Sequence, residues 1–76
     1  MIKPGDMCRI PRGGAIFDLL FLLHGSSNHI VIGPSEALAI AQAPQMFPSA
    51  LPMWIVVSNG RVGVVFEFAI DEIKCQ

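Results

Sequence analysis

Two runs of β-branched residues flank the dipeptide Asn59-Gly60 in the segment "MWIVVSNGRVGVVFEFAI". This dipeptide favours a two-residue type I′ turn, because both central positions of that turn need a positive φ. A turn at residues 59–60 also sets the register of the hairpin, placing Ser58 opposite Arg61 and Trp54 opposite Val65. The sequence therefore predicts a β-hairpin here and a fold dominated by antiparallel strands.

The period of two assigns the side chains of this hairpin to two faces. We expect the core face to be the one that is apolar throughout: Val62, Val64, Phe66, Phe68 and Ile70, with Met53, Ile55 and Val57 opposite them. Trp54, Val56 and Val65 would then point outward. Because a contiguous exposed apolar patch marks an interaction site, these three are predicted interface residues. The alternative is that the middle of the chain folds over them.

Earlier in the chain, two further stretches favour strands. The turn residues Pro4-Gly5-Asp6 lead into an extended segment at residues 7–10, which Pro11 ends. The segment "AIFDLLFLLHGSSNHIVIG" is predicted to form a strand, a turn at residues 25–28 and a return strand. A helix ending at His24 is the alternative. In the strand interpretation Leu20 and Leu22 share one face, and both are included in the predicted interface.

The middle of the chain, residues 34–52, is an apolar, proline-rich connection. A short helix is predicted between Pro34 and Ala43, because the alanines favour it. The alternative is an extended segment in which Leu38 and Ile40 alternate with alanines. Evenly spaced prolines argue for an irregular arm after residue 43, and Met46 and Phe47 on it join the predicted interface.

The composition points to association. The chain has 76 residues, enough for a single domain spanning 1–76, yet 53% are hydrophobic and only 14% are charged. An average soluble domain carries about 25% charged residues. So small a body has too much surface to bury all of its apolar side chains internally. We therefore expect an oligomer or a component of a larger assembly.

The charge distribution and the apolar segments exclude other partners. Five Lys and Arg residues stand against six Asp and Glu residues, with no run of either sign, so no nucleic-acid partner is expected. The alternative is a fold that gathers the scattered basic residues on one face: Lys3, Arg9, Arg12 and Arg61. The apolar stretch "AIFDLLFLL" is too short to span a bilayer, so no membrane partner is expected either.

Residues that could carry chemistry are few. His24 and His29 flank a predicted turn, and Cys8 and Cys75 lie in the first and last predicted strands, where terminal strands of a small barrel can be neighbours. No Cys-x-x-Cys spacing is present, so we expect no metal, no cofactor and two unbridged thiols. No serine lies in a Gly-x-Ser-x-Gly elbow, and an enzyme is not expected.

The chain ends carry a resemblance. The segments "KPGDMCRI", "WIVVSNGRVGVV" and "IDEIKC", with a central hairpin, resemble the small SH3-like β-barrel proteins of tailed bacteriophages. The resemblance implies an antiparallel barrel of about five strands with one short helix or irregular arm in the middle. It also implies a non-enzymatic virion component, such as a capsid decoration or cement subunit. Such a subunit assembles in the host cytoplasm and packs against its own copies or capsid proteins. The alternative is an SH3-like regulatory module that binds nucleic acid or a host protein.

Overall fold

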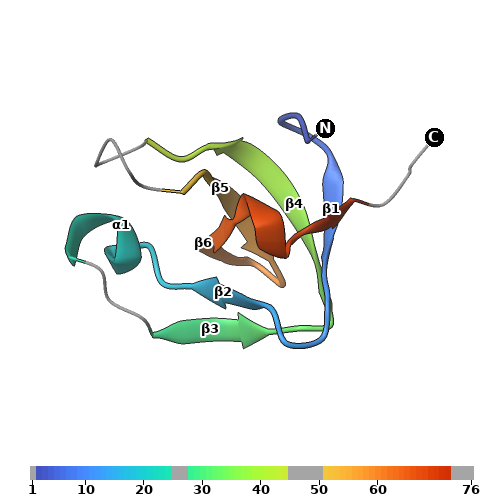
Figure 1. Cartoon of the computed structure of the whole chain (residues 1–76), viewed down its shortest axis with the longest axis horizontal. Coiled ribbons are helices and arrows are strands. Elements are labelled where there is room, and N and C mark those ends of the chain that lie inside the picture. Colours follow the sequence, from blue (N-terminus) through green and yellow to red (C-terminus); the bar gives the residue numbers. More distant parts are fainter. Residues whose placement is uncertain (1, 25–27, 45–50, 73–76) are drawn as a thin grey trace.

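The computed structural model describes residues 2–24, 28–44 and 51–72, and most of these residues lie in one antiparallel sheet (Figure 1). The strands are β1 Met7–Ile10, β2 Ala15–Phe17, β3 His29–Ile32, β4 Ser35–Gln42, β5 Met53–Ser58, β6 Arg61–Phe66 and β7 Asp71–Glu72. A helix, α1 (Leu20–His24), follows β2, and a 3₁₀ turn, η1 (Glu67–Ala69), follows β6. The order across the sheet is β3-β2-β6-β5-β4-β1-β7. The predicted mainly-β class is confirmed, with seven strands instead of about five.

The predicted hairpin at the end of the chain is confirmed in its turn and in its register. Asn59 has φ 52° and Gly60 has φ 77°, the positive values that a type I′ turn requires. Ser58 pairs with Arg61 and Trp54 pairs with Val65. The local turn chemistry alone was sufficient to place β5 against β6.

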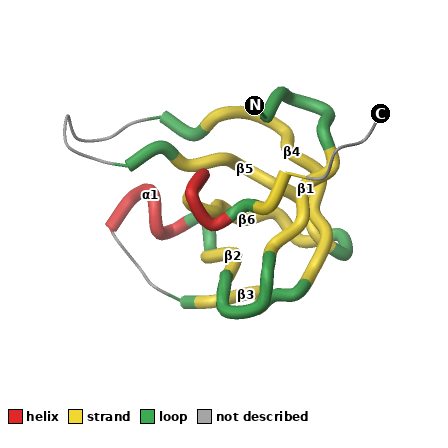
Figure 2. Tube along the Cα trace, turned by 45° about the vertical axis from the view of Figure 1, so that its right-hand side comes forward, coloured by secondary structure: helices red, strands yellow, loops and turns green. Residues whose placement is uncertain are grey.

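The N-terminal turn and strand are also confirmed. The backbone N–H of Lys3 donates to the Asp6 carboxylate at 2.9 Å, which closes the turn over Pro4 and Gly5. β1 follows and ends before Pro11. It pairs with β4 on one side and with β7 on the other, so the two ends of the described chain lie side by side (Figure 2). The first and last described strands are therefore neighbours, as predicted. Cys75 lies outside the described residues.

The strand predicted over residues 16–24 is wrong beyond Phe17, because the chain turns into α1. The Asp18 carboxylate accepts a hydrogen bond from the backbone N–H of Leu20 at 2.9 Å. Aspartate is a favoured N-cap because it satisfies a donor that has no partner within the helix. Leu20 and Leu22 therefore belong to a helical turn. The return strand predicted from "HIVI" is present as β3.

The helix predicted between Pro34 and Ala43 is wrong, and the extended alternative is correct. These residues form β4, which pairs with β1 and with β5. Ala37 and Ala39 point into the core and are each 1% exposed, while Leu38 and Ile40 point away from it. Two paired neighbours supply backbone hydrogen bonds along the whole strand, which overrides the helix propensity of alanine. The irregular arm predicted at Met46 and Phe47 lies outside the described residues.

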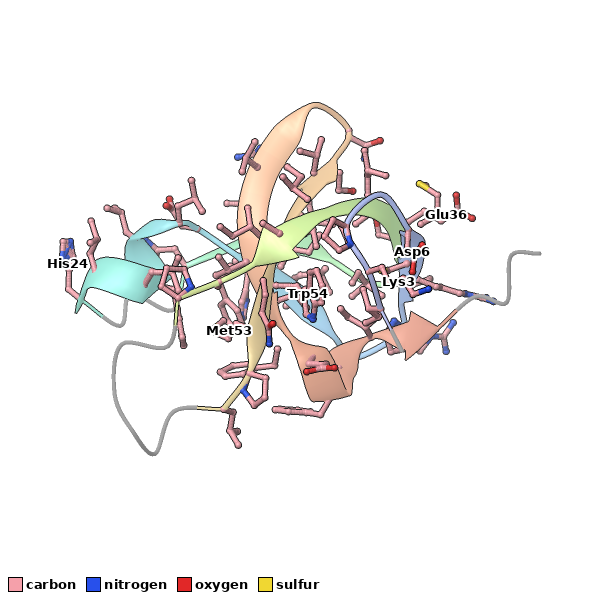
Figure 3. All side chains as sticks on the ribbon, turned by 90° about the horizontal axis from the view of Figure 1, so that it is seen from above. Lys3, Asp6, His24, Glu36, Met53 and Trp54 are labelled. Atoms are coloured by element: carbon pink, nitrogen blue, oxygen red, sulfur yellow. The ribbon has the colours of Figure 1, made fainter. Side chains whose placement is uncertain are left out.

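The sheet buries side chains on both of its faces. The larger cluster contains Ile2, Cys8, Ile10, Ile16, Ala37, Ala39, Trp54, Val56 and Val65. A second cluster around Met53 and Val64 lies on the opposite face, where Phe17, Phe21 and Leu22 pack against it. The core face predicted for the hairpin is therefore correct only in part. Met53 and Val64 are buried in the second cluster as predicted, but Trp54, Val56 and Val65 point into the larger cluster, and Val62 is exposed. Figure 3 shows Trp54 in the middle of the molecule.

Candidate interaction surface

An apolar row crosses four neighbouring strands on the face of the sheet that lies opposite the larger core cluster. Met7 of β1 pairs with Leu38 of β4, Leu38 pairs with Val57 of β5, and Val57 pairs with Val62 of β6. Met7, Leu38 and Val62 are 42%, 40% and 44% exposed, and Val57 is half-buried. We call these four side chains the outer row. Directly opposed side chains on one sheet face lie about 5 Å apart, so the outer row is continuous.

The outer row is exposed because nothing described covers this part of the sheet face. α1 lies at the far end of the molecule from β1, as Figure 1 shows, and its Phe21 and Leu22 pack on Met53 and Val64 instead. On β1 and β4 the buried positions are Cys8, Ile10 and the two alanines. On β4 the alternation places the alanines inward and the larger apolar side chains, Leu38 and Ile40, outward, which is the reverse of an ordinary solvent-facing sheet.

A charged pair borders the outer row. Arg9 of β1 lies directly opposite Glu36 of β4, one side-chain step along the same face from Met7 and Leu38. Both side chains are exposed. Figure 3 shows Glu36 at the periphery of the molecule, far from His24 on α1. The face therefore has two cross-strand pairs between β1 and β4. We call Met7 with Leu38 the apolar rung and Arg9 with Glu36 the charged rung.

A second apolar surface lies at the α1 end. Five aromatic rings form a connected cluster with centroid distances of 5.0 to 6.0 Å: Phe17, Phe21, His29, Phe66 and Phe68. Phe68 stacks on Phe66 and is 73% exposed, and Leu20 and Leu23 on α1 are 43% and 70% exposed. This surface is built from a single turn of helix and a 3₁₀ turn, whereas the outer row lies on paired strands.

The seven predicted interface residues divide into three groups. Trp54, Val56 and Val65 are 5%, 0% and 0% exposed, so their predicted outward orientation is wrong. Leu20 is exposed on α1, and Leu22 is half-buried against the second core cluster. Met46 and Phe47 lie outside the described residues. Sequence analysis missed the outer row, although the alternation of Leu38 and Ile40 with alanines was a signal for it.

The remaining candidate residues are dispersed. Cys8 is buried in β1 and its thiol lies 3.9 Å from the carbonyl oxygen of Asp6. His29 contacts the ring of Phe17, and His24 is exposed at the end of α1. Within residues 2–24, 28–44 and 51–72, no three His, Cys, Asp or Glu side chains come together as a metal site. No described helix is long and apolar enough to cross a membrane.

Comparison of the chain with protein-family models, with curated proteins and with solved structures returned no match. The role of the chain is therefore inferred from its exposed apolar surfaces.

Proposed function

We propose that this chain is a non-enzymatic structural protein that packs against neighbouring subunits through its uncovered apolar surface. The observation that carries the proposal is the outer row, a continuous line of four apolar side chains across β1, β4, β5 and β6. The backbone pairing of the four strands holds these side chains in fixed relative positions. Surfaces of this kind suit permanent contacts, because little conformational entropy is lost when they are covered.

Covering the exposed apolar side chains would lower the free energy of the chain. Fully burying a Val, Leu or Met side chain contributes about 1.5–3 kcal/mol. Members of the outer row are buried by more than half already, so covering each one adds roughly 1 kcal/mol. Ten large hydrophobic side chains in the described part of the chain are exposed, Leu23 and Phe68 most of all. A chain that stayed alone would leave this stabilisation unrealised.

The resemblance of the chain ends extends the proposal. It supports an SH3-like barrel as the finer description of the fold and a small bacteriophage virion component, such as a capsid decoration or cement subunit, as the role. Near-neutral charge supports the same role, because the chain has five basic against six acidic residues. Reversible binding modules usually keep more charge for solubility and for steering of encounters.

The test is the mass of the purified chain in solution, measured by light scattering over a range of concentrations. We expect a mass above the 8.2 kDa of one chain, and we expect Leu38→Lys to lower it. Gln42→Lys is the matched control, since it places the same charge at another exposed position of β4. A chain that is monomeric at every concentration, and that also fails to bind purified phage particles, would contradict the proposal.

A further inference from the structure

We propose that two copies of this chain pair through the face formed by β1 and β4, around a two-fold axis that runs parallel to these strands and midway between them. This inference rests on the proposed function and names the partner as a second copy. Its basis is the set of residues that the strand register places opposite each other on the exposed face.

The register makes the face a two-by-two pattern. Met7 lies opposite Leu38, and Arg9 lies opposite Glu36. All four side chains are exposed and point away from the core, because the residues between them on each strand, Cys8 and Ala37, are buried.

A two-fold axis between the strands makes this pattern complementary to itself. Rotation by half a turn lays β1 of one copy over β4 of the other and leaves positions along the strands unchanged. Met7 then lies over Leu38 of the second copy, and Arg9 lies over Glu36, in two equivalent contacts. Such isologous pairing is the commonest symmetry of soluble oligomers. Packed sheets lie about 10 Å apart, a gap that extended Arg and Glu side chains span together.

Two other two-fold arrangements of the same face, with the axis perpendicular to the strands, are worse. An axis perpendicular to the strands, between the two rungs, lays Met7 over Arg9 and Leu38 over Glu36. Charged groups would then lose water without gaining a partner, which is costly. A perpendicular axis through the charged rung instead lays Arg9 over Arg9. The register of β1 and β4 therefore favours the parallel axis over these two by charge complementarity.

The area that such a contact needs is a small part of the surface of the chain. A specific interface buries at least about 1,000 Å² in total, or roughly 500 Å² from each copy. That is about one tenth of the 4848 Å² surface of the chain. In the proposed arrangement β1 and β4 lie over each other and β5 lies over β7 of the second copy, so the contact crosses four strands of each sheet, spaced about 4.8 Å apart.

The experiment exchanges charges between the two strands. Arg9→Glu places Glu over Glu in both contacts of a pair, and Glu36→Arg places Arg over Arg. Each variant alone should weaken dimerisation at least roughly tenfold, because facing like charges repel. An equal mixture of the two variants should restore the dimer, since every contact then joins a Glu to an Arg. The double variant R9E/E36R should dimerise by itself. Masses come from light scattering, and a dimer has twice the 8.2 kDa of one chain.

The mixture is the decisive measurement. Within one chain Arg9 lies opposite Glu36, so either single variant also changes the charge balance of its own sheet. A defect of that origin stays in each chain and is not repaired by mixing. Lys3→Glu, at an exposed position outside β1 and β4, is the control for a change of net charge.

A second pair of variants provides the same test if Arg9→Glu does not fold. Met7→Lys and Leu38→Glu each place an unpaired charge in the apolar rung, and only their mixture joins Lys to Glu. A mixture no more dimeric than its components, or a wild-type chain that stays monomeric, would overturn the two-fold arrangement. Association that persists in every single variant would also overturn it, but would leave the proposed function standing. Loss of association in Leu38→Lys alone would likewise overturn the two-fold arrangement and leave the proposed function standing.

Discussion

Gly63 of β6 lies directly against the backbone of Phe17 on β2. A Cβ atom at Gly63 would lie 2.5 Å from the carbonyl oxygen of Phe17 and 2.6 Å from Cγ2 of Ile16. β2 and β6 are joined through the pair Phe17 and Val64. This close approach connects the β2–β3 part of the sheet to the rest of it, and it explains the only glycine within β6.

Gly63→Ala should therefore destabilise the chain by opening the contact between β2 and β6. Overpacking a well-filled core costs about 1–3 kcal/mol, and here the closest clash is with backbone that cannot rotate away. The measurement is the midpoint of urea unfolding. The control Gln42→Ala, at an exposed position of β4 outside the outer row, should change stability by less than about 0.5 kcal/mol. Equal midpoints for the two variants would contradict the close packing at Gly63.

The tip of the β5–β6 hairpin gives a second prediction. Gly60 has φ 77° with open space around it, so only its backbone conformation restricts substitution. Gly60→Val should cost about 1–2 kcal/mol, because a branched side chain disfavours positive φ. Gly60→Asn should cost less, since asparagine tolerates this region. Urea unfolding of both variants checks the order, and a reversed order would contradict the type I′ turn.

A buried hydroxyl gives a third prediction. Ser58 is 2% exposed, and its Oγ donates to the carbonyl oxygen of Glu36 at 2.9 Å. The Oγ of Ser35 lies 3.1 Å from the same hydroxyl. Ser58→Ala should cost about 0.5–1.5 kcal/mol, because it removes the hydrogen bond to the Glu36 carbonyl oxygen, which then keeps only the longer 3.4 Å contact from Ser35 Oγ. Ser35→Ala is the control and should cost less, since that side chain is only half-buried. Thermal unfolding of the two variants provides the comparison.

These positions also show how far sequence analysis reaches. The turn at Asn59 and Gly60 and the register of its strands follow from local chemistry, so they were predicted correctly. The core face of the hairpin was predicted only in part, because both faces are apolar and the period of two says only which side chains lie together. Gly63 was the missed signal: it has no side chain because β2 approaches that face.

Two elements were predicted as the wrong type, α1 as part of a strand and β4 as a helix, and the cause is similar. Both segments are short, and short apolar runs do not distinguish a helix from a strand by periodicity. Asp18 could have indicated the start of α1 as an N-cap. The pairing of β4 with two neighbours depends on residues far away in the sequence, and no local pattern reports it. The outer row was missed together with β4: the alternation of Leu38 and Ile40 with alanines was its local signal, but the row exists only once β4 is a strand.

Trp54 gives the last prediction, and it tests the corrected core. It is the single tryptophan of the chain, it is 5% exposed, and it shares the larger cluster with Val56 and Val65. Replacing a buried aromatic residue with alanine costs about 3–5 kcal/mol, a large fraction of the stability of so small a domain. Trp54→Ala should therefore lose most of its β-sheet circular dichroism signal. An interface residue would instead lose only association.

A conservative variant separates volume from polarity at the same position. The indole N–H of Trp54 is buried and has no hydrogen-bond partner among the described residues. A buried donor without a partner costs about 1–3 kcal/mol, so Trp54→Phe removes that penalty while it shortens the ring system. We expect Trp54→Phe to fold and to be much more stable than Trp54→Ala in urea. In the wild-type chain, Trp54 fluorescence should be blue-shifted and should move to longer wavelength together with the loss of circular dichroism. A red-shifted emission in the folded chain, or a folded and stable Trp54→Ala variant, would show that Trp54 lies outside the core.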